Sequence, residues 1–308
     1  MTDSEDKNKP VVALYGLGNM GFAVAEQLAR AFALKVHDPN RDQVVRAMDS
    51  LGAQAIDDIS ELRTAHAIVL CLPRPSISLE VIRQVAPVLN PDTVIIESST
   101  VNPEDIQVCV DQARPFGIEV VDASILAGVP QMRSGEAMLA VGGSDGAIDR
   151  IDDVLQAMSA RQIRFGPSGA GAAAKVVNNA VAHAVMVVVA EAGAMATAAG
   201  VNTQKMIDLL SDSKMGLHRP LTYRYAERVV KGDYEGGMSL DAARKDSELA
   251  LRLAQTLGVP LFAIQSTHSV YEMAACAGLG RQDYASLVQL WEGWGKPVTD
   301  ESGTDTAS

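Results

Sequence analysis

Cysteine and aromatic residues are scarce in this 308-residue chain, and their scarcity limits the kinds of protein it can be. The cysteines are Cys71, Cys109 and Cys276, and they form no Cys-x-x-Cys pair. A disulfide-built scaffold and a metal site are therefore not expected, and buried free thiols in a reducing compartment are. With aromatic residues at 4%, the core must consist of Ala, Val, Leu, Ile and Met.

Positive charge is also in short supply. The formal net charge is −12, which disfavours nucleic acid and anionic membranes as partners. Residues 1–9 are polar and lack the apolar region of a signal peptide, so the cytoplasm is the expected location. His183 and Glu191 interrupt the apolar stretch 180–199, which favours an interior helix over a membrane span.

Short apolar runs alternate with helical patterns in the first half of the chain. Continuous apolar runs suit strands that are buried on both faces, so this half predicts a Rossmann-type, mostly parallel sheet with helices on both faces. The expected strands are 11–15, 33–37, 67–72, 94–97, 119–122, 139–141 and 162–165. The expected helices are 20–30, 41–51, 77–86, 103–116 and 147–158, the last capped by Asp145.

The pattern changes at the glycine-rich segment 166–171, after which only helical patterns follow. The predicted helices are 172–199, 204–211, 220–231, 241–257, 265–277 and 284–294. The first of these is apolar nearly all round, so we expect it to be buried between domains and against a subunit partner in a homodimer or homotetramer. The predicted domains are a dinucleotide-binding domain at 11–165, an interdomain helix at 166–199 and an all-helical domain at 200–297, between flexible tails at 1–10 and 298–308.

A glycine fingerprint joins the first expected strand to the first expected helix. Gly16 permits a tight turn, Gly18 lets the backbone approach a pyrophosphate, and Gly21 lets the helix pack closely on the strand. The N-terminus of the helix offers free N–H groups to the phosphates. The segment predicted to bind a dinucleotide is Gly16, Leu17, Gly18, Asn19, Met20 and Gly21.

An acidic residue after the second expected strand bears on which dinucleotide is bound. Asp38 lies about 20 residues past the fingerprint, where a carboxylate accepts a hydrogen bond from the ribose 2′-hydroxyl. The same carboxylate repels a 2′-phosphate, so we predict NAD rather than NADP, although Arg41 nearby carries the opposite charge. Leu72 and Pro73, at the end of the third expected strand, are also assigned to the cofactor site.

A cofactor that takes hydride needs a second group from the protein, one that moves the hydroxyl proton. Lys175 lies one turn into the long helix, and Asn179 follows at i+4 on the same face. Desolvation lowers the pKa of a lysine, which suits acid–base chemistry near neutral pH. Taken alone, a solvated lysine and asparagine near a helix start is the simpler interpretation.

Four segments together resemble the β-hydroxyacid dehydrogenase family, which includes 3-hydroxyisobutyrate dehydrogenases and tartronate semialdehyde reductases. They are the fingerprint, residues 97–100 (ESST) with Pro103, residues 166–179 with the spacing G-x-x-G-x-G-x-x-x-K-x-x-x-N, and Lys245-Asp246. The resemblance implies an NAD-dependent dehydrogenase of a small anionic β-hydroxy acid. It also implies Lys175 as general acid–base, Asn179 as substrate anchor, and Thr100 and Lys245 near the cofactor.

One segment departs from the family pattern. The family usually has Asp-x-Pro-Val-Ser-Gly-Gly where this chain reads DASILAG over residues 122–128. The family serine and first glycine help to hold the substrate carboxylate, whereas Leu126 has no hydroxyl and Ala127 is merely small. We therefore expect Leu126, Ala127 and Gly128 to line a substrate pocket of altered shape with a more apolar wall.

Two other functions stay open at this point. Leu126 and Ala127 suggest a reductase of the same fold acting on an imine or a non-acid carbonyl, but imine reductases that resemble this family generally lack a lysine at the position of Lys175. The other is a non-catalytic, NAD-binding regulatory module, although the residues expected for cofactor binding and proton transfer are all present.

The loop residues Lys214, His218 and Arg219 are interpreted as solvated, with contact to an anionic substrate tail as the alternative.

Overall fold

The structure, a computed structural model, describes residues 9–292 and 294. The chain divides into two compact units, Met1–Val181 (the first unit) and Ala182–Ser308 (the second unit), and the boundary falls inside one long helix. The predicted tail at 298–308 and most of the one at 1–10 lie outside the described residues. The domain bounds expected from the sequence stay predictions.

The first unit is built on one sheet of eight strands in the order β3-β2-β1-β4-β5-β6-β7-β8. The strands are β1 Val11–Tyr15, β2 Ala33–His37, β3 Gln54–Ala55, β4 Ala67–Leu70, β5 Val94–Glu97, β6 Glu119–Leu126, β7 Met138–Gly142 and β8 Arg161–Gly166. All neighbouring pairs are parallel except β6 and β7, which are antiparallel. This confirms the predicted Rossmann-type, mostly parallel sheet.

Strand direction decides which residues meet at one edge of this sheet. The carboxyl ends of β1, β4, β5 and β6 share an edge, where ligands of open α/β sheets bind. Because β7 runs antiparallel to β6, the first residues of β7 and β8 come to the same edge. The sequence pattern gave no sign of this reversal.

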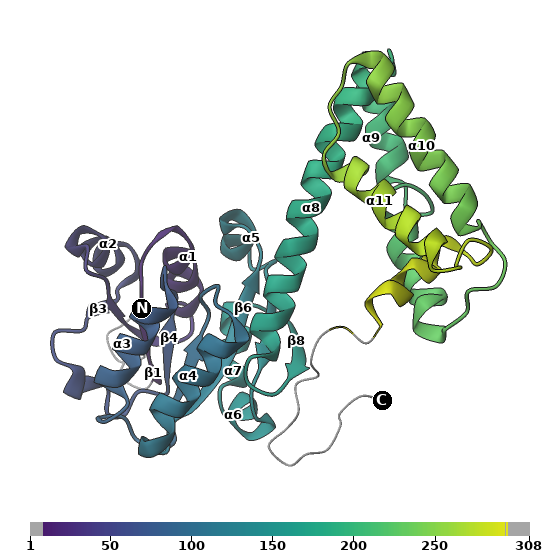
Figure 1. Cartoon of the computed structure of the whole chain (residues 1–308). Coiled ribbons are helices and arrows are strands. Elements are labelled where there is room, and N and C mark those ends of the chain that lie inside the picture. The colour runs from purple at the N-terminus through teal and green to yellow at the C-terminus, as the bar shows by residue number, and fades with distance from the viewer. Residues whose placement is uncertain (1–8, 293, 295–308) are drawn as a thin grey trace. The chain divides into compact units, whose positions relative to one another are not determined.

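Helices cover both faces of the sheet (Figure 1). In the first unit they are α1 Asn19–Leu28, α2 Arg41–Leu51, α3 Pro75–Val85, α4 Pro103–Ala113, α5 Val129–Ser134, α6 Asp145–Arg150, α7 Asp152–Met158 and the start of α8 Ala170–Ala198, with 3-10 helices at Ile59–Leu62 and Arg114–Phe116. The predicted helix 147–158 is in fact broken at Ile151 into α6 and α7. Its predicted cap, Asp145, is also wrong, because the hydroxyl of Ser144 accepts the N–H of Ala147 at 3.1 Å.

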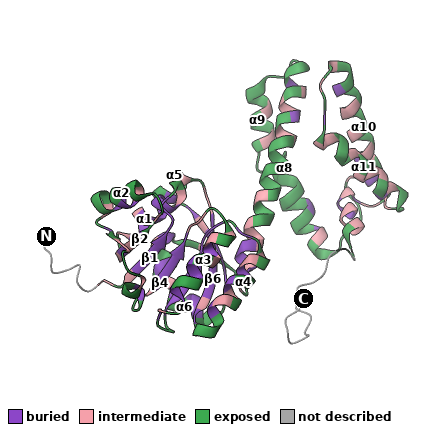
Figure 2. Ribbon diagram, turned by 60° about the vertical axis from the view of Figure 1, so that its left-hand side comes forward, coloured by how far each residue is buried: buried purple, intermediate pink, exposed green. Residues whose placement is uncertain are grey.

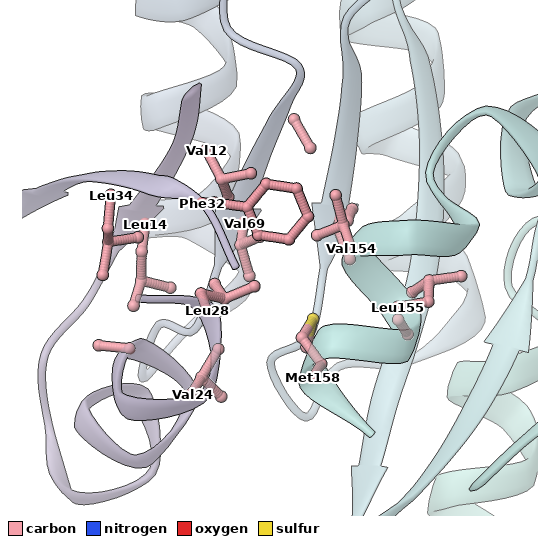
Figure 3. Close-up of a cluster of buried hydrophobic side chains, with 14 of the residues drawn as sticks. Val12, Leu14, Val24, Leu28, Phe32, Leu34, Val69, Val154, Leu155 and Met158 are labelled. Carbon is pink, nitrogen blue, oxygen red and sulfur yellow. The ribbon is translucent and has the colours of Figure 1, made fainter. Parts of the chain in front are cut away.

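The core of the first unit consists mainly of aliphatic side chains on both faces of the sheet, and β1, β4, β5, β6 and β7 are among its most deeply buried elements (Figure 2). On one face α1 and α7 pack against β1, β2 and β4 (Figure 3), with α3 and α4 against the other face. Figure 3 labels Val12, Leu14, Val24, Leu28, Phe32, Leu34, Val69, Val154, Leu155 and Met158. All three cysteines are free, but the expected burial holds only for Cys109, since Cys71 is half-buried and Cys276 is exposed.

Helices make up the second unit, whose described residues include one isolated bridge, Ser239 with Asp283, and no longer strand. The elements are the rest of α8, α9 Thr203–Ser211, a π-helix Pro220–Tyr225, a 3-10 helix Val229–Lys231, α10 Leu240–Leu257, α11 Ala263–Cys276 and a 3-10 helix Tyr284–Trp291. The single helix predicted over 220–231 is thus replaced by a π-helix and a short 3-10 helix.

A carboxylate on α8 caps another helix of the second unit. The oxygens of Glu191 accept hydrogen bonds from the backbone N–H groups of Phe262 at 2.6 Å, Ala263 at 2.9 Å and Ile264 at 3.0 Å. These groups are the orphan donors at the N-terminus of α11. Burial raises the pKa of Glu191, but the three hydrogen bonds outweigh it and hold that pKa below its usual range.

The long helix α8 exposes much of its apolar surface. Val177, Val181 and Met186 are 62%, 58% and 62% exposed, so they find no cover within their own units. Among the described residues, α8 is the one helix that is long and apolar enough to cross a membrane, by length and composition alone. The burial expected for this helix against a subunit partner stays a prediction.

Candidate active site

The glycine fingerprint forms a turn that requires glycine at Gly16 and Gly21. Gly16 has a φ of +97°, and a Cβ there would lie 2.2 Å from the carbonyl oxygen of Cys71. A Cβ on Gly21 would lie 2.0 Å from the carbonyl oxygen of Gly16, so the helix could not pack where it does. Gly18 instead faces open space, with no atom within 4 Å of a Cβ, and as N-cap it leaves the first N–H groups of α1 without a side-chain partner. This cradle fits a pyrophosphate.

Asp38 follows the end of β2 and turns its carboxylate towards the fingerprint. Its Oδ2 accepts the N–H of Leu17 at 2.7 Å, and its Oδ1 accepts the N–H of Asn40 at 2.8 Å. Arg41, the residue of opposite charge, lies with its guanidinium 3.9 Å from the Asp57 carboxylate. The acidic group therefore belongs to the wall of the site, held in place by two backbone hydrogen bonds.

A cavity of about 650 Å³, here called the cofactor cavity, runs along this edge of the sheet. Predicted site residues that line it are Gly16, Gly18, Asn19, Met20, Gly21, Asp38, Leu72, Pro73, Thr100, Ala127 and Lys175. Leu17 is fully buried and contributes its N–H to Asp38 rather than a wall. Lys245 belongs to the second unit, on α10, with its ammonium 3.1 Å from Asp246, and its assignment to the cofactor stays a prediction.

Buried polar groups fix the loop that carries Thr100. Glu97, at the end of β5, is fully buried, and its Oε1 accepts the N–H of Ser99 at 2.8 Å. The hydroxyl of Ser99 in turn accepts the N–H of Leu72 at 2.8 Å, which ties the ends of β4 and β5 together. Burial raises the pKa of Glu97, although hydrogen bonds from Ser78 and Ser99 oppose the shift. Residues 97–100 were recognised from the sequence as a family segment, but these hydrogen-bonding roles of Glu97 and Ser99 were not predicted.

Asp122 of β6 holds the start of the helix that carries Lys175. Its Oδ1 accepts the N–H of Gly169 at 2.6 Å, and its Oδ2 accepts the N–H of Ala172 at 2.8 Å. Burial raises the pKa of Asp122, and these backbone hydrogen bonds counteract it. The close approach requires glycine at Gly171, where a Cβ would lie 2.3 Å from the carbonyl oxygen of Ala140. The glycine-rich spacing thus fixes α8 against the sheet.

Lys175 lies one turn beyond this anchor. Its Nζ donates a hydrogen bond to the carbonyl oxygen of Ile125 at 2.7 Å, next to the substrate segment 126–128. Burial of the side chain lowers the pKa of its ammonium group. Part of the ammonium's hydration has thus been replaced by a single carbonyl, an arrangement that favours proton exchange.

A second cavity of about 420 Å³, here called the distal cavity, also reaches Lys175. It is lined by Leu126, Ala127, Glu136, Met138, Arg161, Lys175, Asn178 and Asn179, so Ala127 and Lys175 belong to both cavities. Gly128 lines neither, and serves as the N-cap of α5. Sequence reasoning missed Glu136, Met138 and Arg161, because they reach this edge only through the reversed direction of β7.

The remaining predicted residues lie in the second unit. Lys214, His218 and Arg219 are exposed, as the solvated interpretation expects, and the Arg219 guanidinium lies 4.5 Å from the centre of the Tyr223 ring. Within the described residues, no group of three or more His, Cys, Asp or Glu side chains is placed to hold a metal ion.

Comparison with known proteins identifies the family. A family model described as the NAD binding domain of 6-phosphogluconate dehydrogenase matches residues 11–168, and one described as NAD-binding of NADP-dependent 3-hydroxyisobutyrate dehydrogenase matches residues 169–291. The chain belongs to the β-hydroxyacid dehydrogenase family, as its motifs predicted. It is thus an NAD(P)-dependent oxidoreductase of the class that acts on CH–OH groups.

Individual relatives are distant but cover nearly the whole chain. The chain is 28% identical over 289 residues to 2-(hydroxymethyl)glutarate dehydrogenase of Eubacterium barkeri, which covers 91% of this chain and 94% of that one. It is 26% identical over 282 residues to 3-sulfolactaldehyde reductase of Escherichia coli K12, with 90% and 94% covered. A solved imine reductase from Pseudomonas sp. has a TM-score of 0.76 at 23% identity, with 92% and 99% covered, which shows a shared fold.

Proposed function

We propose that this protein is an NAD-dependent dehydrogenase that moves hydride between the nicotinamide and the hydroxyl-bearing carbon of a small β-hydroxy acid, or of the matching semialdehyde or keto acid, with Lys175 as general acid–base. One observation carries the proposal. Lys175 lines the cofactor cavity and the distal cavity at once, and burial lowers its pKa. Such an amine suits proton exchange with a hydroxyl held between the two cavities.

Each residue then has a defined task. NAD, when bound, supplies the hydride acceptor. In oxidation the neutral amine of Lys175 takes the hydroxyl proton, and in reduction its ammonium returns that proton. The hydrogen bond to Ile125 keeps Nζ at the junction of the cavities. Asn179, one turn further along α8, offers an amide donor and acceptor to the substrate in the distal cavity.

The preference for NAD over NADP rests on Asp38. Its carboxylate lines the cofactor cavity, and two backbone N–H groups fix it there, so it cannot swing away from a ribose. A fixed carboxylate accepts a hydrogen bond from a 2′-hydroxyl and repels a 2′-phosphate. Arg41 is turned to Asp57 and does not line the cofactor cavity.

The substrate class is proposed from the site and from the relatives. Two of them are named for 2-(hydroxymethyl)glutarate and 3-sulfolactaldehyde, both anionic. A small anionic hydroxy acid is accordingly proposed for this chain. We also propose a cytoplasmic homodimer or homotetramer in which a second copy covers the exposed apolar side chains of α8. With a net charge of −12, neither nucleic acid nor an anionic membrane is proposed as a partner.

A second candidate function is reduction of an imine or a non-acid carbonyl. The apolar side chains of Leu126 and Ala127 in the distal cavity favour it, because they provide no hydroxyl for a carboxylate. Two cationic groups, of Lys175 and Arg161, and one carboxylate, of Glu136, line the same cavity, and this excess of positive charge disfavours a positively charged iminium. Hydroxy-acid oxidation is therefore the better-supported function.

A substrate screen tests the proposed function. NADH or NADPH formation would be followed with 3-hydroxyisobutyrate, L-threonate and 2-(hydroxymethyl)glutarate, and a cyclic imine would be supplied with NADPH in parallel. We expect acid oxidation with NAD, with kcat/KM rising with pH up to a pKa below the usual 10.5 of lysine, because the neutral amine is the active base. For reduction, kcat/KM should fall over the same range. Turnover of the imine alone would overturn the proposal.

A further inference from the structure

The distal cavity is larger and more charged than a minimal hydroxy acid requires. Its volume is about 420 Å³, and Glu136, Arg161 and Lys175 line it. Cavities of about 300–1,000 Å³ hold drug-sized ligands, so one of this size exceeds what a three- or four-carbon acid fills. The cavity therefore has room for a substituent in addition to the hydroxyl-bearing carbon and the first carboxylate.

Strand register places Arg161 beside the substrate segment. Met138, the first residue of β7, pairs with Leu126 across the antiparallel β6–β7 ladder. The same Met138 pairs with Arg161 across the parallel β7–β8 ladder. Three strand ends thus bring Leu126, Met138 and Arg161 side by side along one wall of the distal cavity. The position of Arg161 is set by the sheet and not by a mobile loop.

Arg161 is the cation of this cavity that is free to bind an anion. Lys175 already donates to Ile125, and its proton is required for the reaction. The carboxylate of Glu136 accepts a hydrogen bond from the Ser134 hydroxyl at 3.0 Å. Across residues 9–292 and 294, the Arg161 guanidinium has no hydrogen-bond or ion-pair partner, and its side chain is exposed. A guanidinium remains charged at all relevant pH values and binds carboxylates through two parallel N–H donors.

We propose that Arg161 is a specificity residue that binds a second anionic group of the substrate, carried at the end of the carbon chain away from the hydroxyl group. The preferred substrate is then a hydroxy acid with a second carboxylate or a sulfonate. This inference rests on the proposed function and names its substrate class. Leu126, which has no hydroxyl, and Met138 form the apolar wall along which the carbon chain lies, while Lys175 serves the hydroxyl.

Steady-state kinetics with paired substrates test this role. Wild-type enzyme should have a higher kcat/KM for 2-(hydroxymethyl)glutarate, a dicarboxylate, than for 3-hydroxyisobutyrate, a monocarboxylate. Arg161→Gln should raise KM for the dicarboxylate about 10- to 100-fold, because a hydrogen-bonded charge pair is lost, with kcat and the monocarboxylate constants nearly unchanged. Arg161→Lys should recover part of the loss. Equal effects on both substrates, or an effect on kcat alone, would overturn the inference.

Arg164→Gln provides the matched control on the same strand. The Arg164 guanidinium lies 2.7 Å from Asp149 and 3.6 Å from Asp145, and Arg164 does not line the distal cavity. Both substrates should keep their wild-type constants in this variant. A selective loss for the dicarboxylate in Arg164→Gln would show that general surface charge, and not Arg161, selects the substrate.

A binding experiment separates this inference from the proposed function. Glutarate and butyrate, which lack the hydroxyl, would be titrated calorimetrically into protein saturated with NADH. Glutarate should bind at least about 10-fold tighter than butyrate, and Arg161→Gln should abolish the difference. If no hydroxy acid is turned over but this difference is found, the proposed function fails and the anion site stands. If glutarate and butyrate bind alike, the anion site is refuted whatever the enzyme oxidises.

Discussion

The two units of the chain differ in how far their residues are buried (Figure 2) and in the kinds of side chain that they bury. In the first, β1, β4 and β5 are almost wholly buried, and their side chains are mainly aliphatic. In the second, α9 has no buried residue, and the large apolar residues that are buried are Leu240 and Leu261. Its buried charged residues are Glu191, Arg224, Arg228 and Asp283. The interior of the first unit is thus mainly apolar, whereas the second unit buries charged groups that need their ion-pair and hydrogen-bond partners.

This difference has a functional meaning. A rigid, apolar sheet can hold backbone N–H groups, carboxylates and a lysine at one edge in fixed geometry, and the described site residues of both cavities belong to the first unit. The second unit offers exposed helix surface instead, which suits association more than chemistry. Changes in the first unit should therefore affect the reaction, and changes in the second should affect stability.

Lys175→Ala should have the largest effect on activity. Loss of the general acid–base should lower kcat about 10²- to 10⁴-fold, because proton transfer at the hydroxyl is no longer assisted. The NAD dissociation constant should stay close to wild type, since the pyrophosphate cradle is formed by Gly16 to Gly21. Lys205→Ala, which removes an exposed lysine of α9, is the control and should keep normal kinetics. A Lys175→Ala enzyme with ordinary kcat would refute the assignment.

Asp283→Ala should have the largest effect on stability. Asp283 is fully buried, and its Oδ2 lies 3.1 Å from Arg224 and 3.8 Å from Arg228. Removing it leaves the buried guanidinium of Arg224 without a counter-charge and leaves Arg228 with Asp233 at 3.7 Å. This should cost about 3–5 kcal/mol in the free energy of unfolding. Urea unfolding, followed by circular dichroism, would measure the loss.

The exposed pair of Glu248 and Arg252 is the matched control for Asp283. Glu248→Ala removes a carboxylate from the surface of α10 and should cost no more than about 0.5 kcal/mol. If Asp283→Ala cost as little, the buried guanidinium groups would not depend on Asp283, and the contrast between the units would be lost.

Much of the first unit could be predicted from the sequence, and the reason is local. A strand buried on both faces must be an unbroken apolar run, and the fingerprint glycines act on their immediate neighbours, so both patterns are visible in short windows. Asp122 and Arg161 act on residues far along the chain, and which strand end they reach depends on strand direction. Glu191 likewise caps a helix that begins more than 70 residues later, and a polar residue inside an apolar run gives no hint of its partner.

Asp38→Ala should have an intermediate effect, confined to the cofactor. NAD should bind about 10-fold more weakly, because the acceptor for the ribose 2′-hydroxyl is lost, and the bias against NADP should relax. Asp38 also holds Leu17 and Asn40, so a parallel Asp42→Ala variant, on exposed α2, controls for loss of surface charge. Fluorescence titration with NADH and NADPH would measure both constants. A wild-type enzyme that already prefers NADPH would contradict the role given to Asp38.

Mild acid should have the smallest effect, and its effect on stability should have opposite signs in the two units. Burial raises the pKa of Glu97 and Asp122, so the folded first unit takes up protons more readily than the unfolded chain and gains stability as pH falls towards the usual carboxyl range. The pKa of Glu191 is lowered from its usual 4.5, so its contribution is complete above that value and is lost as pH falls below it. Below pH 4.5 amide hydrogen exchange should therefore rise first in α11. Glu191→Gln should raise amide exchange in α11 already at neutral pH and weaken the pH dependence of that exchange. If acid raised exchange in β5 and β6 before it did so in α11, the predicted order of the two units would be wrong.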